Sequence, residues 1–143
     1  MIDEAHPQLS SLALSLPSSA AGGGKASAED GFLQMYEIFN MRMRPDLVTL
    51  SACETGLGKQ VQGEGLVGLT RAFFYAGAPS LVLSLWNVDD RSTASLMEDF
   101  YRRLQATRDS KADALREAKL SLIRDGHFAH PYYWAAFVLN GKP

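Results

Sequence analysis

Hydrophobic positions along the chain alternate between short apolar runs and stripes at helical spacing. Three near-continuous apolar runs, Leu47–Ala52, Ser80–Trp86 and Tyr133–Asn140, predict strands that are buried in a sheet. Between them, Leu66–Ala76 and Ser92–Ala106 have the spacing of helices. Strands that alternate with helices of about ten or more residues predict an α/β fold with a parallel sheet.

Local start and stop signals predict further elements. Ser110 is a typical N-cap residue for a helix that Gly126 would end. The stretch Asp30–Asn40 has near-helical spacing and predicts a short helix. Leucines in residues 9–16 predict an edge strand, and the Ser/Ala/Gly-rich residues 17–29 predict a flexible loop within the domain.

Length, composition and charge limit the class of protein. A chain of 143 residues favours one domain, and 46% hydrophobic with 21% charged residues is ordinary for a globular protein. The net charge of -2 favours neither nucleic acid nor an anionic membrane as a partner. No apolar run approaches the ~20 residues of a membrane-spanning helix. Residues 1–7 lack the basic and apolar regions of a secretion signal, so we expect a cytoplasmic protein.

The single cysteine, Cys53, directly follows the first predicted strand. A lone cysteine is either a small buried hydrophobe or a nucleophile. Ligands of open parallel sheets bind outside the carboxyl ends of the strands, where this thiol is expected to lie. The next residues form a pliable, glycine-rich loop with glycines at 56, 58, 63 and 65. We interpret Cys53 as a nucleophile.

A phosphate-binding loop is the alternative at this position. Gly58 and Lys59 fit the pattern of such a loop, but Cys53 stands at its leading glycine and Gln60 at its magnesium-binding hydroxyl. The dinucleotide-binding glycine pattern fails as well, because Val61 replaces its last glycine. The sequence therefore argues against a nucleotide cofactor.

The residues around Cys53 also carry a specific resemblance. The motif Leu50–Gly56 (LSACETG) is followed by GEGL from Gly63, SLW from Ser84 and HP from His130. In this order and spacing the motifs resemble the CHAT domain, a relative of caspases and separase. The similarity runs from about residue 7 to residue 141.

This resemblance implies a caspase–hemoglobinase-like three-layer α/β fold with a mostly parallel central sheet. It implies that residues 1–143 are a partial domain, whose N-terminal strands lie upstream. It also implies a Cys–His dyad and no metal or organic cofactor. The family histidine belongs to a His-Gly pair expected before the chain starts, since His6 is followed by Pro7. Repeat domains, such as tetratricopeptide repeats, are expected in the parent protein.

Two other histidines lie near the last predicted strand. His127 and His130 precede it, and in a parallel sheet its amino end would lie opposite the Cys53 side. We therefore interpret both as helix-end or turn residues.

Four polar or aromatic residues are candidates for substrate binding. Glu54 either orients a partner of the nucleophile or is a solvated loop acid. The resemblance implies that the loop after the second strand lines the pocket for the residue before the scissile bond, which makes Trp86, Asp89 and Asp90 candidates. Asp89 suits a basic substrate residue and Trp86 an apolar one, whereas Asp90 is alternatively a helix N-cap.

Two functions remain open at this point. The first is a cysteine endopeptidase acting on protein or peptide substrates, of which this chain carries the Cys half. The second is a non-catalytic, peptidase-like signalling or interaction module.

Overall fold

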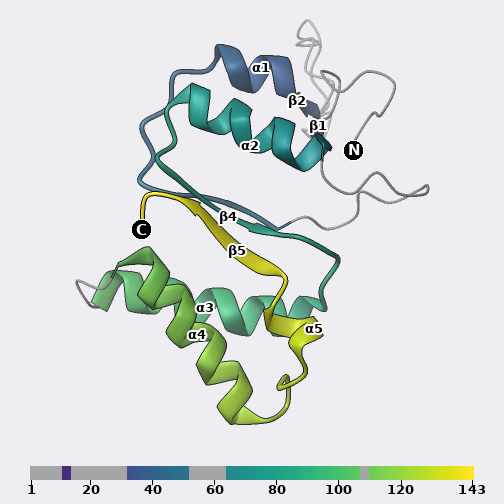
Figure 1. The fold of residues 1–143 in the computed structure, drawn as a ribbon, viewed down its shortest axis with the longest axis vertical. Coiled ribbons are helices and arrows are strands. Elements are labelled where there is room, and N and C mark those ends of the chain that lie inside the picture. The colour runs from purple at the N-terminus through teal and green to yellow at the C-terminus, as the bar shows by residue number, and fades with distance from the viewer. Residues whose placement is uncertain (1–10, 14–31, 52–63, 107–109) are drawn as a thin grey trace, which may run out of the picture. The chain divides into compact units, whose positions relative to one another are not determined.

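The computed structural model describes residues 11–13, 32–51, 64–106 and 110–143 (Figure 1). The chain divides into two compact units. The N unit comprises Met1–Arg44 and Thr55–Gly77, and the sheet unit comprises Pro45–Glu54 and Ala78–Pro143. The predicted loop 17–29 lies outside the described residues.

The N unit contains a strand pair that leads directly into a helix. Strand β1 (Ser11–Ala13) pairs antiparallel with β2 (Phe32–Gln34), and α1 (Met35–Asn40) follows β2 without a break. The Gln34 amide donates to Glu37 Oε2 at 2.7 Å, which satisfies one free donor at the start of the helix. The prediction of one helix over Asp30–Asn40 was wrong for Phe32–Gln34, because pairing with β1 holds these residues extended.

Helix α2 (Glu64–Ala76) packs against α1. It begins two residues before the predicted start at Leu66 and ends just before Gly77, as the sequence predicts. The rings of Phe39 and Tyr75 meet edge to face, with their centroids 5.5 Å apart. The buried side chains of this helix pair are Met35, Ile38, Leu69, Ala72, Phe73 and Ala76.

Gly77 allows the chain to turn sharply after α2. Its φ of 110° lies in the region that favours glycine, and a Cβ there would collide with the Met43 carbonyl oxygen. The Met43 amide meanwhile donates to the Ala76 carbonyl at 2.7 Å, so the two segments cannot easily separate.

Gly77→Ala is therefore expected to lower the free energy of unfolding by about 2 kcal/mol or more, since backbone strain and the collision add. Gly126→Ala is the matched control, because its φ is 85° but a Cβ would meet no atom within 4 Å. Its expected cost is about 1 kcal/mol, from strain alone. Urea denaturation followed by circular dichroism measures both values, and equal losses would contradict a role for the Met43 contact.

The sheet unit is built on three strands in the order β3 (Val48–Leu50), β4 (Ser80–Ser84) and β5 (Phe137–Gly141). β3 and β4 are parallel, but β5 runs antiparallel to β4. The structure is thus mixed α/β, and the expected parallel direction was wrong for the last strand. The cause is the connection: α3 (Asp90–Ala106) leads away from the carboxyl end of β4, and α4 (Lys111–Asp125) leads back to it (Figure 1).

A short helix, α5 (Pro131–Trp134), precedes β5. The prediction that Tyr133 and Trp134 belong to the strand was wrong. Pro131 fixes a backbone angle suited to the first helical position, and His130 caps the turn. β4 likewise ends at Ser84, so Trp86 lies in the loop beyond it.

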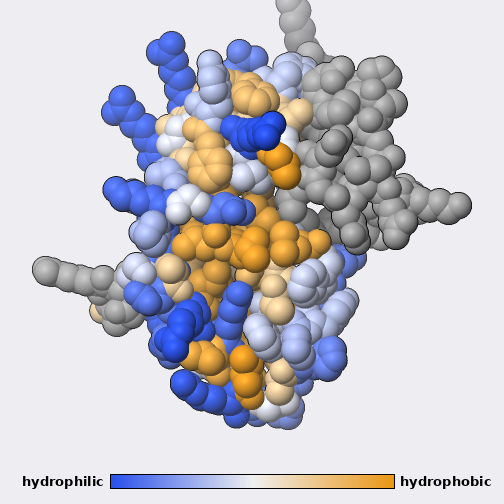
Figure 2. Space-filling view, viewed as in Figure 1, coloured by the Kyte–Doolittle hydropathy of each residue, from blue (hydrophilic) through white to orange (hydrophobic). Residues whose placement is uncertain are grey.

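One face of the sheet packs against α3 and α4. Val82 from the central strand joins this core, whereas Leu81 and Leu83, which alternate with it, are buried on the other face. The sheet lies in a zone where hydrophobic side chains gather on the visible surface (Figure 2). The buried cluster on the helix side consists of Val82, Leu96, Phe100, Ala114, Leu115, Ala118, Leu122, Ala136 and Phe137.

The predicted limits of α4 are confirmed. Ser110 Oγ accepts a hydrogen bond from the Asp113 amide at 3.1 Å, and Gly126 ends the helix in the left-handed conformation. Lys119 of this helix donates from Nζ to the Phe137 carbonyl at 2.6 Å, which ties α4 to β5. Burial lowers the pKa of Lys119 below its ordinary value.

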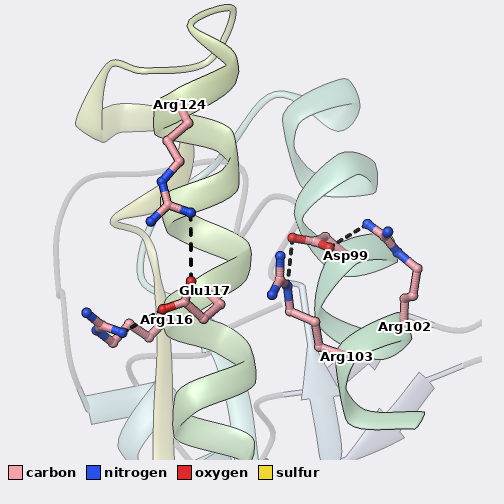
Figure 3. Close-up of polar contacts among 6 residues, drawn as sticks. All are labelled: Asp99, Arg102, Arg103, Arg116, Glu117 and Arg124. Atoms are coloured by element: carbon pink, nitrogen blue, oxygen red, sulfur yellow. Dashed lines mark hydrogen bonds and ion pairs between the residues drawn. The ribbon is translucent and has the colours of Figure 1, made fainter. Parts of the chain in front are cut away.

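Charged side chains on α3 and α4 form two ion-pair groups (Figure 3). The nearly buried Asp99 accepts from Arg102 at 2.5 Å and from Arg103 at 3.0 Å. On α4, Glu117 pairs with Arg116 at 2.6 Å and lies 3.9 Å from Arg124. The Arg102, Arg116 and Arg124 side chains are largely exposed, so the pairs formed by these arginines contribute little to stability.

Candidate functional site

The candidate site lies at the carboxyl edge of β3 and β4. Leu50 pairs with Leu83, so the two parallel strands end side by side, at the ordinary spacing of about 5 Å. Ser51 continues from β3 and is exposed. Cys53 and Glu54 lie outside the described residues, and their assignments stay predictions.

Trp86 lies in the loop that leaves this edge just beyond the end of β4. Its indole Nε1 donates to the Tyr132 carbonyl oxygen at 3.0 Å, and its side chain remains partly exposed. The Leu85 amide donates to the Ala136 carbonyl at 2.9 Å, which extends the β4–β5 ladder by one step. The loop after β4 is therefore tied at two points to the segment before β5.

Asp89 is the N-cap of α3. Its Oδ1 accepts from the Arg91 amide at 3.1 Å and from the Ser92 amide at 3.0 Å, and its main-chain carbonyl accepts from the Thr93 amide at 3.0 Å. Asp90 is exposed and is the first residue of the helix. The alternative that Asp90 is the cap was wrong, because α3 already begins at Asp90, two residues before the predicted start at Ser92.

His130 lies at the same edge as the candidate site. Because β5 is antiparallel, its amino end adjoins the carboxyl end of β4, where Ser84 pairs with Phe137. The expectation that His130 lies on the side opposite the end of the first strand was wrong for this reason. The interpretation of the two histidines as turn and helix-end residues is confirmed: His127 is exposed in the turn after α4, and His130 caps α5.

The cap also limits the chemistry of His130. Its Nδ1 accepts from the Tyr132 amide at 3.2 Å, so the neutral ring carries its proton on Nε2. With the cap formed, the Nδ1 lone pair points at the Tyr132 amide and not at a thiol.

Aromatic side chains gather before β5. The rings of Tyr132 and Tyr133 have centroids 5.4 Å apart, and those of Phe128 and Tyr133 are 5.2 Å apart. The Trp134 indole donates to the Ala129 carbonyl at 3.0 Å. Tyr132 was missed as a site candidate, because its link to Trp86 is made by a main-chain carbonyl, which no residue type signals.

The described residues lack two further features. In ranges 11–13, 32–51, 64–106 and 110–143, no three His, Cys, Asp or Glu side chains gather in a way that could hold a metal ion. No helix in the same ranges combines the length and apolar character needed to cross a bilayer.

Comparisons with known proteins identify one domain family and two relatives. The profile of the CHAT domain matches residues 1–142. Tetratricopeptide repeat protein 28 of Mus musculus is 34% identical over 110 residues, which cover 77% of this chain and 4% of that protein. Tetratricopeptide repeat protein 28 of Homo sapiens is 29% identical over 141 residues, which cover 96% of this chain and 6% of that protein. The chain thus spans a small part of these relatives, and no solved structure matches it.

Proposed function

Because the chain belongs to the CHAT domain family, which is peptidase-like, we propose that it is the nucleophile-bearing part of a cysteine endopeptidase domain with Cys53 as the attacking thiol. The proposal extends to a caspase–hemoglobinase-like fold and to residues 1–143 as a partial domain. Its substrates are proteins or peptides, and its parent protein carries tetratricopeptide repeats, as the relatives do by name.

The observation that carries the proposal is the parallel pairing of β3 and β4. The carboxyl ends of parallel strands form the edge at which α/β enzymes place reactive groups. Leu50 and Leu83 pair at that edge, and the chain leaves β3 there toward Cys53. The loop with Trp86, Asp89 and Asp90 leaves the neighbouring strand at the same edge, which supports a shared site for nucleophile and substrate.

β3 is the strand beside which the histidine is proposed to lie. It is an edge strand of the described sheet, so one further strand can pair with it. An upstream strand paired there, with a His-Gly pair at its end, would place an imidazole beside Cys53.

The chemistry needs that imidazole. A free thiol has a pKa near ~8.5, so only a few per cent is thiolate at neutral pH. A neighbouring histidine takes the thiol proton, the thiolate sulfur attacks the peptide carbonyl carbon, and the imidazolium then protonates the leaving amine. Main-chain N–H groups near the nucleophile would stabilise the oxyanion. Water hydrolyses the thioester and regenerates the thiol, so the cycle needs no metal or organic cofactor.

The test compares two proteins against a peptide library: this chain, and the same chain extended upstream through the nearest His-Gly pair. Cleavage that depends on Cys53 supports the proposal. If the extended protein does not cleave any peptide, the second candidate function, a non-catalytic interaction module, is favoured instead.

Glu54 is proposed to orient the histidine, and Glu54→Gln in the extended protein tests this role.

Asp89 is proposed to shape the site by holding its loop. Asp89→Asn should keep the cap and leave stability unchanged, since asparagine caps helices as well as aspartate. Asp89→Ala should lower the free energy of unfolding by about 1 kcal/mol. Urea denaturation measures both variants.

The same two variants decide whether the carboxylate also selects a basic substrate residue. With a positioning role alone, Asp89→Asn leaves the cleavage profile of the extended protein unchanged. A selective loss of cleavage after Arg and Lys in Asp89→Asn, at unchanged stability, would contradict that role and favour an acidic pocket.

A further inference from the structure

A side-chain hydrogen bond joins α3 to the strand from which the chain runs to Cys53. Thr49 Oγ1, in the middle of β3, lies 2.6 Å from the Tyr101 hydroxyl oxygen on α3, although the two residues are 52 positions apart in the sequence. Both residues belong to the sheet unit, so the bond lies within one compact body. Since Thr49 precedes Cys53 by four residues, a contact that holds Thr49 also limits where the thiol can lie.

β3 is less enclosed than its neighbour β4. All five residues of β4 are buried, whereas the three residues of β3 are only partly buried. In the described part of the chain, β3 pairs with β4 and with no other strand. Thr49 pairs with Val82, and Leu47, two residues before Thr49, packs on the helix-side cluster that contains Val82. Thr49 thus lies on the face of β3 that is turned to the helices, where the Tyr101 hydroxyl meets it.

Tyr101 presents its hydroxyl from a well-anchored part of α3. The preceding residue, Phe100, is fully buried in the cluster between α3, α4 and the sheet. The rings of Phe100 and Tyr101 have centroids 5.2 Å apart, and the Tyr101 side chain is 41% exposed. A hydrogen bond between partly exposed groups adds little to the stability of the whole domain, so we expect its main effect on the position of β3.

We propose that Tyr101 is a positioning residue for the nucleophile: its hydroxyl holds β3 through Thr49, and β3 in turn holds the start of the loop that carries Cys53. The inference rests on the proposed function for the role of Cys53. A displacement of about 1 Å between reacting groups can lower a rate about 100-fold. Loss of the hydrogen bond therefore acts on the chemical step and leaves substrate binding largely unchanged.

The first test measures the mobility of β3 in this chain and needs no catalysis. Amide hydrogen exchange is followed by NMR in ¹⁵N-labelled wild type, Tyr101→Phe and Thr49→Val, each of which removes one hydroxyl and keeps the shape of the side chain. Exchange of the β3 amides is expected to be about 5-fold faster in either variant, the effect of one lost hydrogen bond on local opening. Exchange in α4 should stay unchanged.

Two further proteins control this measurement. The double variant Thr49→Val/Tyr101→Phe should exchange no faster in β3 than either single variant, because both substitutions remove the same bond. Tyr75→Phe removes a tyrosine hydroxyl from α2, in the N unit, and should leave β3 exchange as in wild type.

The second test measures cleavage by the extended protein. Tyr101→Phe and Thr49→Val are each expected to lower kcat about 10-fold and to leave KM within about 2-fold, because a displaced thiol loses rate and not binding. The double variant should lose no more than either single variant.

Unchanged β3 exchange in both single variants would overturn the inference. The same holds if the two effects add in the double variant, or if KM rises while kcat is unchanged. Failure of the proposed function is seen separately, as absence of Cys53-dependent cleavage by the extended protein with Tyr101 intact. In that protein, faster β3 exchange in Tyr101→Phe would keep Tyr101 as the anchor of β3 and remove its role in catalysis.

Discussion

Cleavage of peptides by this chain alone is expected to be about 10²–10⁴-fold slower than by the chain extended upstream through the nearest His-Gly pair. This factor is the usual contribution of a positioned general acid–base group. His130 cannot supply that group while its Nδ1 caps α5, and the Cys53 thiol is mostly protonated at neutral pH. The measurement is kcat/KM for the same fluorogenic peptide, at equal protein concentration and equal fraction folded.

Three variants of the extended protein show which residues cause that difference in kcat/KM. Cys53→Ala should abolish cleavage, and alanine in place of the upstream histidine should reduce it to the level of the short chain. His130→Gln should leave it within about 3-fold, because His130 serves as a cap and not as the base. Equal rates for the short and extended chains would contradict the assignment of the histidine, and His6 would then be the first residue to replace.

The largest loss of stability is expected for Phe100→Ala. Phe100 is fully buried at the centre of the cluster formed by α3, α4 and the sheet. Truncating a buried phenylalanine costs about 3–5 kcal/mol, from lost transfer energy and the cavity left behind. Domains are typically stable by only about 5–15 kcal/mol, so this variant should be close to unfolding at 25 °C.

Urea denaturation of wild type, Phe100→Ala and Phe100→Leu checks this expectation. Leucine keeps most of the volume, so Phe100→Leu should lose less than about 1.5 kcal/mol. A loss below about 1 kcal/mol for Phe100→Ala would show that the sheet unit does not depend on this cluster. Tyr101→Phe is a control on the same helix, where the substitution removes only the partly exposed hydroxyl that is 2.6 Å from Thr49 Oγ1.

Elements with local signals could be predicted from the sequence. The spacing of apolar residues in α3, and the Ser110 and Gly126 ends of α4, act through contacts within a few residues. The short, uninterrupted apolar run of β4 likewise predicts a strand buried on both faces, and all five of its residues are buried. These features depend on the segment itself rather than on its partners.

Features set by distant partners could not be predicted in the same way. The direction of β5 depends on where α4 returns the chain, and no local pattern records that position. Residues Phe32–Gln34 continue a helical pattern, yet they pair with β1, which lies about twenty residues earlier in the chain. In such segments tertiary pairing overrides local propensity.

The candidate site also combines features that local sequence predicts with features that depend on distant partners. Asp89 could be predicted as a loop residue after β4, but the predicted strand Ser80–Trp86 ran two residues past the observed end at Ser84 and included Trp86. The choice of Asp89 over Asp90 as cap depends on a one-residue difference in where α3 begins. The partner of Trp86 is a main-chain carbonyl, so only the structure identifies its hydrogen bond with Tyr132.

Covalent trapping shows whether Cys53 is a catalytic nucleophile. The extended protein is treated with a peptidyl acyloxymethyl ketone that carries phenylalanine next to the reactive group, and the adduct is measured by intact mass and peptide mapping. This chain has a single cysteine, so within it a thiol adduct is unambiguous. We expect one adduct per chain, on Cys53, which is lost in Cys53→Ala and forms much more slowly when the upstream histidine is replaced. Absence of a Cys53 adduct in folded protein, with full labelling of the same cysteine by iodoacetamide after denaturation, would contradict this expectation.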